Sequence, residues 1–173
     1  MRNNRLLKRI FPLIALLMLL PWPVAYAFDV TGADQDAVQI EVAEPAAQPS
    51  YNVFGKAIGS VDPGELFYID ATGNIEDTVA TLYLTNANEL VNHYIFLMLK
   101  VGVYIENDGN WEKAYASNGE LIPETILSMR NGQVSFLLPG YAKYRVAIDG
   151  GSFYAINAHD DGNLSPQLYL EVN

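Results

Sequence analysis

Hydrophobic and polar residues alternate over short stretches along most of this chain, a pattern that predicts β-strands rather than helices. The stretches Val79 to Leu84 and Tyr94 to Leu99 are rich in β-branched, aromatic and large apolar residues, as buried strands are. Turn-forming pairs recur between such stretches: Pro63-Gly64, Asp108-Gly109, Asn118-Gly119, Asn131-Gly132, Gly150-Gly151 and Asp161-Gly162. Residues 51–173 are therefore expected to form an all-β domain, a jelly-roll-like β-sandwich. Residues 86–93 are expected to add one helical turn.

Two of these turns predict β-hairpins in which apolar residues meet on one face. The turns are Asn131-Gly132 and Gly150-Gly151, and each leaves a consistent register when it is given two residues. The facing pairs are Met129–Val134 and Leu127–Phe136 in the first hairpin, and Ile148–Phe153 and Val146–Ala155 in the second. The polar residues between them then share the opposite face, so we expect both hairpins.

The first 27 residues follow a different pattern. Four basic residues precede an apolar run from Ile10 to Leu20, and Ala25-Tyr26-Ala27 follows it. This order is typical of a secretory signal peptide with an A-x-A cleavage site. The run is shorter than the roughly 20 residues that a membrane span needs. We therefore expect cleavage after Ala27, a secreted extracellular or cell-surface protein and no membrane contact after cleavage; an uncleaved anchor is the alternative.

Residues 28–50 are acidic, rich in small residues, and end in a Pro-Ala spacer. Within them, Val38-Gln39-Ile40-Glu41-Val42 alternates strictly, which predicts a strand with Val38, Ile40 and Val42 on its buried face. The alternative is a chance alternation in a mobile N-terminus. The expected organisation is a signal peptide at 1–27, an extended N-terminal segment and linker at 28–50, and the β-sandwich at 51–173.

The charge and the cysteine content exclude several classes of function. Residues 1–27 hold four of the ten basic residues and none of the twenty acidic ones, so the rest of the chain carries a net charge of about −14. Phosphate backbones would repel such a chain, so we expect no nucleic-acid partner. The absence of cysteine excludes thiol catalysis and disulfides. Stability must then come from the core, from a metal or from other subunits.

Catalytic motifs are absent from the sequence. The two histidines are not in an H-E-x-x-H arrangement, and there is no G-x-S-x-G motif. We therefore expect a protein that is not an enzyme. A secreted hydrolase is kept as an alternative, ranked third among the functions considered, and it would need two neighbouring carboxylates in a cleft.

Two loops crowded with oxygen donors are candidate calcium sites. The residues concerned are Asp108, Asn110, Asp160, Asp161 and Asn163. The alternative is that these residues serve only the tight turns in which Asp, Asn and Gly are common. The eleven tyrosines and two tryptophans raise a second binding hypothesis, because aromatic rings stack on sugars. Packing between strands is the alternative use of those rings.

The stretch from Gly59 to Tyr104 resembles the camelysin/TasA-like family of secreted bacterial fibre subunits and their archaeal pilus relatives. The segment Leu66-Phe67-Tyr68-Ile69-Asp70 is similar to the family's early strand, and Asn74 to Thr78 stands at its turn. The run from Thr85 to Leu90 is similar to the family's asparagine loop and to archaeal cannula subunits. The resemblance implies a jelly-roll subunit of an extracellular filament, joined to its neighbour by a donated N-terminal strand. Some members are described as metalloproteases, but this chain has no zinc motif.

The alternating strand at Val38, Ile40 and Val42 leads to the same hypothesis from the residues alone. A strand supplied by a neighbour covers a sheet edge with main-chain hydrogen bonds while its apolar side chains fill pockets. Such a head-to-tail contact does not close, so it builds fibres of identical subunits, such as a pilus or biofilm matrix. The alternative from another class is a monomeric carbohydrate-binding β-sandwich, for which a polysaccharide is the partner.

Overall fold

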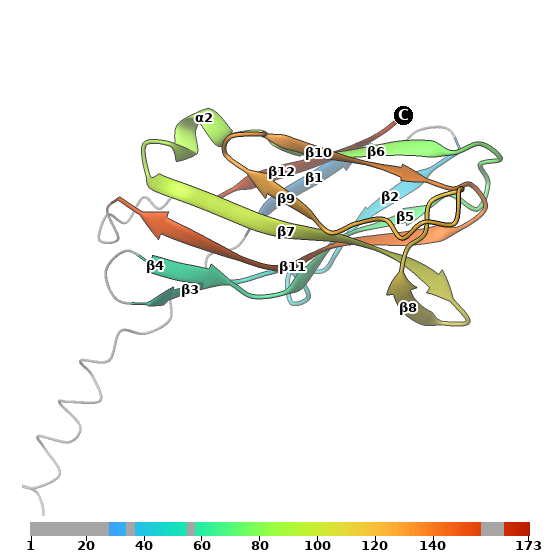
Figure 1. Ribbon diagram of the computed structural model, residues 1–173, viewed down its shortest axis with the longest axis horizontal. Helices are drawn as coiled ribbons and strands as arrows, with labels where there is room; N and C mark the ends of the chain where they lie inside the picture. Colours follow the sequence, from blue (N-terminus) through green and yellow to red (C-terminus); the bar gives the residue numbers. More distant parts are fainter. Residues whose placement is uncertain (1–27, 34–36, 55–57, 157–164) are drawn as a thin grey trace, which may run out of the picture.

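The computed structural model describes residues 28–33, 37–54, 58–156 and 165–173, and these residues form an almost entirely β structure with two sheets (Figure 1). The predicted signal peptide and the calcium-site residues Asp160, Asp161 and Asn163 lie outside these residues. The elements are β1 (Asp29–Ala33), β2 (Gln39–Val42), β3 (Tyr51–Phe54), β4 (Ile58–Val61), β5 (Gly64–Asp70), β6 (Thr78–Leu84), α2 (Ala87–Leu90), β7 (Tyr94–Asn107), β8 (Asn110–Lys113), β9 (Thr125–Ser128), β10 (Gln133–Leu138), β11 (Lys143–Ala155) and β12 (Gln167–Val172). The all-β class, the strands at 79–84 and 94–99 and the helical turn after Asn86 are confirmed. Among the described residues, none belongs to a helix long and apolar enough to cross a membrane.

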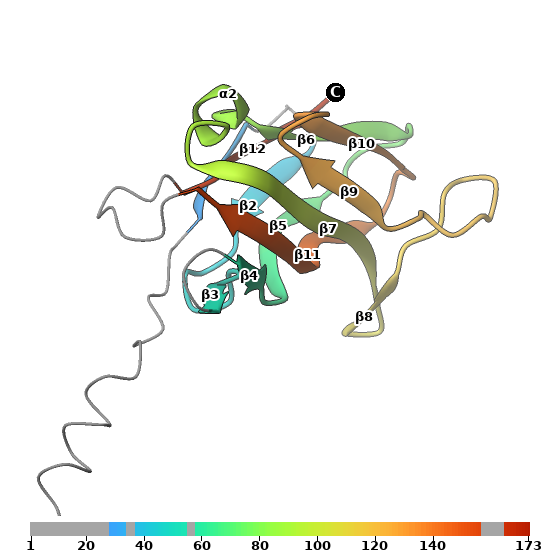
Figure 2. The same ribbon diagram turned by 60° about the vertical axis from the view of Figure 1, so that its left-hand side comes forward.

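The two sheets face one another as a sandwich (Figure 2). The smaller sheet has the order β1-β12-β6-β10, with β1 parallel to β12 and the other pairs antiparallel. In the larger sheet the long strand β11 is central, with β7 along one side of it. Its other side pairs first with β5, which continues to β2, and then with β4, which continues to β3. Both β8 and β9 pair with the far side of β7.

The core lies between the sheets and draws on nearly every strand. Its largest fully buried side chains are Tyr144, Phe67, Leu66, Ile69, Leu82, Leu90, Leu97, Leu99, Leu127, Leu138 and Ile148. Strand β10 illustrates how the sequence makes this arrangement. Val134, Phe136 and Leu138 are buried while the residues between them are exposed, as the period of two requires.

The predicted hairpin at Gly150-Gly151 is wrong, because β11 runs on through these residues and pairs with β7 on both sides of them. The register shifts at this point, where Ile148 faces Val101 and Gly150 faces Lys100, so Asp149 is the extra residue of a β-bulge. Gly150 has a φ of 137°, which glycine tolerates better than other residues. A bulge changes which residues face the core just as a turn would, which is why the apolar pattern fitted a hairpin.

The predicted hairpin at Asn131-Gly132 is also wrong. Strand β9 pairs with β7 in the larger sheet, and β10 pairs with β6 in the smaller one. The turn therefore carries the chain from one sheet to the other. Asn131 holds it through its side chain, which accepts from Ser128 N at 2.7 Å and donates to Ile126 O at 2.7 Å. Leu127 and Phe136 are both buried, but they enter the core from opposite sheets.

A second crossing between the sheets, from β10 to β11, is fixed by Tyr144. Its side chain is fully buried, and its hydroxyl donates to the carbonyl of Pro139 at 2.6 Å. A tyrosine that bonds back to the chain a few residues upstream is the corner device of Greek-key sandwiches. Gly140 makes room for the crossing, since a Cβ there would lie 2.7 Å from Asn74 O.

Candidate functional site

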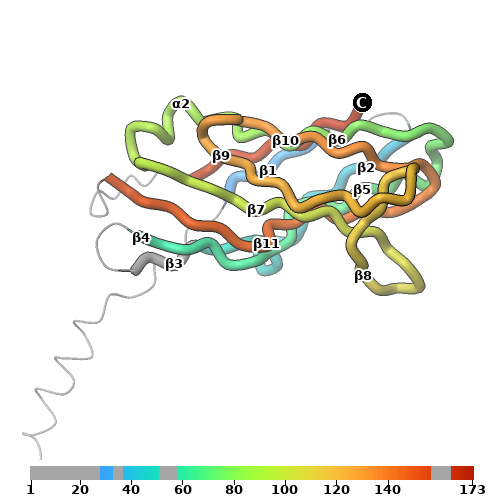
Figure 3. The backbone as a smooth tube through the Cα atoms, viewed as in Figure 1, coloured from blue at the N-terminus to red at the C-terminus, as the bar shows by residue number. Residues whose placement is uncertain are grey.

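The N-terminal residues 28–33 and 37–42, here called the N-terminal arm, lie along one lateral edge of the sandwich (Figure 3). Strand β1 is an edge strand of the smaller sheet and β2 is an edge strand of the larger sheet. The two strands also contact each other: a Cβ on Gly32 would lie 2.9 Å from Ile40 Cγ2 and 3.6 Å from Phe67. The arm therefore closes this edge by covering the core between the two sheets.

The three apolar residues of the predicted donor strand differ in their degree of burial within the arm. Val38 is 2% exposed and belongs to the core, Ile40 is partly buried against it, and Val42 is 37% exposed. Gln39 and Glu41 are exposed, as the alternation predicted. In the single chain, β2 pairs antiparallel with β5 of the same molecule, from Gln39 opposite Asp70 to Val42 opposite Phe67.

Residues 43–50, here called the linker, follow the arm and are held against β5 by backbone hydrogen bonds. Ala43 N donates to Leu66 O at 2.9 Å, and Glu65 N donates to Ala47 O at 2.8 Å. Gly64 is essential to this contact, because a Cβ at that position would overlap the backbone of Gln48 and Pro49. Residues 28–50 were expected as an extended segment and linker; in the single chain the described ones pack onto the sandwich.

The opposite lateral edge of the sandwich, formed by β9 and β10, has no comparable cover among the described residues. There, β9 pairs only with β7 and β10 only with β6. A groove of about 190 Å³ beside them is lined by Leu121, Thr125 and Leu137. Both leucines are about half exposed, and the buried hydroxyl of Thr125 has no hydrogen-bond partner. We call β9 and β10 the open edge.

The outer face of the larger sheet carries aligned charged and aromatic side chains. Glu41, Tyr68, Arg145, Tyr104 and Lys113 occupy successive paired positions across β2, β5, β11, β7 and β8. Adjacent strands therefore bring together residues that are far apart in the sequence. We call these residues, together with Glu65, Trp111 and Asp149, the aromatic–ionic face.

Arg145 is at the centre of this face. Its guanidinium lies 4.7 Å from the centroid of the Tyr104 ring and 5.2 Å from that of Trp111, which are cation–π distances. It forms an ion pair with Glu65, and Glu65 also accepts a hydrogen bond from the hydroxyl of Tyr68. The rings of Tyr68 and Trp111 are 5.8 Å apart and tilted by 43°. These contacts hold both rings in place.

The bulged residue Asp149 anchors the other side of the face. One carboxylate oxygen accepts from Tyr104 at 2.6 Å, and the other pairs with Lys113 at 2.6 Å. This carboxylate lies over Gly102, where a Cβ would overlap Asp149 Oδ2 and lie 2.8 Å from Lys113 Nζ. The glycine therefore provides the space that this ion pair fills, and the bulge turns Asp149 towards it.

The contacts in this face change the acidity of its members. The hydrogen bond to Glu65, with burial, raises the pKa of Tyr68 to about 12. Burial and the bond to Asp149 also raise the pKa of Tyr104. For Lys113, burial alone would lower the pKa, but the bonds to Asp149 and Tyr104 outweigh it and raise the pKa. At neutral pH both tyrosines are therefore protonated and Lys113 is charged.

A cavity of about 520 Å³ adjoins the face where β2, β5, β8 and β11 meet, and we call it the Trp111 pocket. Its lining includes Gln39, Glu41, Tyr68, Asp70, Trp111 and Lys143. The carboxylate of Asp70 accepts hydrogen bonds from the side chain and the backbone N–H of Thr72, and these bonds lower its pKa. Its Oδ2 lies 3.7 Å from Lys143 Nζ.

Sequence reasoning missed this pocket and the aromatic–ionic face. The available signal was the repeated placement of aromatic or charged residues at alternate positions of neighbouring strands.

Turn geometry accounts for the described half of the calcium hypothesis. Asp108 and Gly109 have φ values of 50° and 79° in the two-residue turn from β7 to β8, as a type I′ turn requires. Asn110 is paired with Asn107 at the base of this turn. Within the described residues, no three Asp, Glu or His side chains are grouped as a metal site would need.

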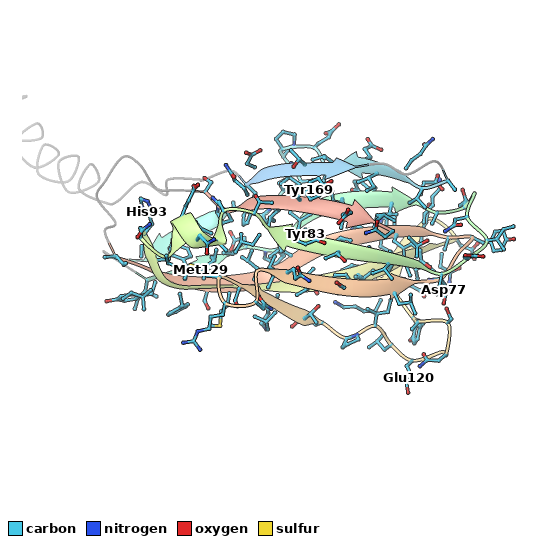
Figure 4. The ribbon with its side chains drawn as sticks, turned by 90° about the horizontal axis from the view of Figure 1, so that it is seen from above. Asp77, Tyr83, His93, Glu120, Met129 and Tyr169 are labelled. Carbon is cyan, nitrogen blue, oxygen red and sulfur yellow. The ribbon has the colours of Figure 1, made fainter. Side chains whose placement is uncertain are left out.

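The outer face of the smaller sheet carries a pair of tyrosines in place of the cation–π contacts of the aromatic–ionic face (Figure 4). There Tyr83 and Tyr169 are neighbours on β6 and β12, with ring centroids 6.2 Å apart, and Tyr83 donates to Glu171 at 3.1 Å. His93 is half-buried at the end of the sandwich beside α2.

Neither a scan against models of protein families nor a search of curated proteins gives a match to this chain.

Proposed function

We propose that this protein is a secreted structural subunit of an extracellular filament, built by donation of the N-terminal arm to a neighbouring subunit. The proposal includes the cleavage of residues 1–27 and a jelly-roll arrangement of the sandwich. The observation that carries it is the position of the arm, which forms an edge strand of each sheet and would begin the chain after the proposed cleavage. A terminal segment at a sheet edge can be replaced by the same segment of another copy.

The contacts of the arm are the same whichever subunit supplies it. Phe28 and Val38 enter the core, and β2 forms its ladder with β5. Exchange between copies therefore keeps the buried surface and changes only the linker and the effective concentration. Because each subunit gives one arm and receives one, the contact repeats without closing. The resemblance of residues 59–104 to secreted fibre subunits supports the same proposal.

The linker gives this assembly a kinetic barrier. The hydrogen bonds of Ala43 and Ala47 to β5 must break, or form again with the neighbour, before the arm can leave its own subunit. We therefore expect filaments to grow after a lag, and to grow faster at higher protein concentrations, where pairing of the arm with a second copy is favoured.

Calcium is kept as a proposed ligand of the loops at Asp108 and Asp160. Filament growth is therefore compared in the presence of calcium and in the presence of a chelator.

The test compares the chain starting at Phe28 with a chain starting at Ala43, by negative-stain electron microscopy and size exclusion. The longer chain is expected to form filaments and the shorter one none. A synthetic peptide of residues 28–42 is then added to the shorter chain, with a Val38→Asp peptide as the matched control. The unmodified peptide is expected to bind and to restore a folded, unpolymerised domain.

Filaments made by the chain without its arm would contradict the proposal. So would a complete chain that stays monodisperse at high concentration, and that result would favour a single binding module instead. The Val38→Asp peptide distinguishes specific insertion from non-specific binding, because a carboxylate buried in the core should prevent that peptide from docking.

A further inference from the structure

The Trp111 pocket has the composition of a saccharide site rather than of an apolar ligand site. Its volume of about 520 Å³ falls inside the roughly 300–1,000 Å³ range of small-molecule sites. Trp111 and Tyr68 both line it, and each is partly exposed. Arg145 contacts the Trp111 ring but does not line the pocket. The indole is thus held by the protein and is also open to a ligand.

Polar groups surround the two rings. Gln39, Glu41, Asp70 and Lys143 line the pocket and supply amide, carboxylate and ammonium groups. Asp70 is already oriented by Thr72 and Lys143, so its carboxylate is a fixed acceptor. Fixed polar groups around an aromatic surface suit a ligand with one apolar face and many hydroxyls, because each hydroxyl must replace its bonds to water. A sugar ring has this form.

The charge of the pocket restricts the class of sugar. Among the described residues that line it, Glu41, Asp70 and Glu106 are acidic and Lys143 alone is basic, so these residues give it a negative net charge. The twenty acidic residues of the chain add to the repulsion of anions. We infer that the Trp111 pocket binds a saccharide without acidic groups, stacked on Trp111 and Tyr68 and hydrogen-bonded by Gln39, Glu41 and Asp70. The pocket is complete whenever a β2 strand is paired with β5, whichever subunit supplies that strand.

Intrinsic fluorescence tests this inference directly. Trp22 and Trp111 are the two tryptophans of the chain, so tryptophan-selective excitation of a chain that starts at Phe28 reports on Trp111 alone. The emission is recorded while neutral gluco-, galacto- and manno-oligosaccharides, chitosan oligomers, oligogalacturonate and pentalysine are added. A neutral or amino sugar is expected to shift the emission saturably, and oligogalacturonate is expected to leave it unchanged.

Variants locate the binding. Tyr68→Ala is expected to lower the affinity for the sugar about tenfold, because one stacked ring is lost. Tyr169→Ala is the matched control, because it removes a ring from the outer face of the other sheet. Gln39→Ala keeps both rings and is expected to weaken binding by a smaller factor. Circular dichroism checks that each variant is folded.

Three results would overturn the inference. The first is an emission that no sugar of the panel changes at millimolar concentration. The second is saturation by pentalysine at a lower concentration than by any sugar, which would make the pocket a site for cationic peptides. The third is an equal loss of binding in Tyr68→Ala and Tyr169→Ala, because Tyr169 is not part of the pocket.

Discussion

The two lateral edges of this sandwich are built differently. On one side the N-terminal arm covers the core with β1 and β2, and Val38 is 2% exposed there. On the other side, the described residues leave the outer sides of β9 and β10 unpaired, with Leu137 47% exposed. An edge covered by the chain terminus can exchange its cover with another copy, whereas an uncovered edge can only meet another surface. In the proposed filament we therefore expect the arm to be the specific contact between subunits and the open edge to be a weaker one.

The largest expected effect comes from a charge placed in the arm. Val38→Asp would bury a carboxylate in the core and should lower the free energy of unfolding by about 3 kcal/mol or more. Leu137→Asp on the open edge is the matched control and should change it by less than about 0.5 kcal/mol. Urea denaturation measures both. Equal losses would show that the two edges do not differ in the way proposed.

A smaller effect is expected where the linker crosses β5. Gly64→Ala would push the backbone of Gln48 and Pro49 away from the sheet and should cost about 2 kcal/mol. Gly73→Ala is the control, because its Cβ would lie 3.5 Å from Ala37 O, an ordinary contact. Thermal unfolding compares the two variants. The same melting temperature in both would rule out a tight crossing at Gly64.

The corner that joins β10 of the open edge to β11 should respond to alkaline pH. Tyr144→Phe loses the bond to Pro139 and should cost about 1 kcal/mol at neutral pH. Burial raises the pKa of Tyr144 to about 12, against about 10 in an unfolded chain. The unfolded state therefore loses this proton first, and stability falls as pH rises from 10 to 12. The variant should lose less over that interval; equal slopes in urea denaturation would refute this role.

The smallest effect on stability is expected at the open edge itself. Leu137→Lys replaces an exposed apolar side chain with a charge, so the free energy of unfolding should change by less than about 0.5 kcal/mol. Lysine on an edge strand discourages pairing with other edges. We expect filaments of normal length that associate less side by side, as counted in electron micrographs. Shorter filaments would mean that this edge takes part in the main contact.

The local pattern of the sequence predicted the strands and their faces better than their partners. The alternation in β10 identified Val134 and Phe136 as buried, because a period of two depends only on the residue and its neighbours. The same pattern did not reveal that β9 and β10 belong to different sheets. A bulge at Asp149 and a turn at Gly150 would have the same effect on which positions of the following residues are buried. Only the pairing of β11 with β7 shows that the chain has a bulge here and not a turn.

The aromatic–ionic face could not be assembled from the sequence for a related reason. Glu65 and Arg145 are 80 residues apart and meet only because β5 and β11 are paired. Each strand alone shows a charged or aromatic residue at alternate positions, which an ordinary solvent face also shows. The strand at Val38 to Val42 was predicted, because its pattern is local, and which subunit it pairs with stays a prediction.

Disulfide trapping tests that prediction most directly, because the chain has no cysteine of its own. Gln39 and Asp70 are paired across β2 and β5, so Gln39→Cys with Asp70→Cys should form a disulfide. Thr81→Cys with Ser135→Cys is the control, since this pair joins β6 and β10 within one chain. After assembly and oxidation, the first variant should give a ladder of covalent oligomers on a non-reducing gel and the control only monomers. Fully oxidised monomers from filaments of the first variant would contradict the donation of the arm.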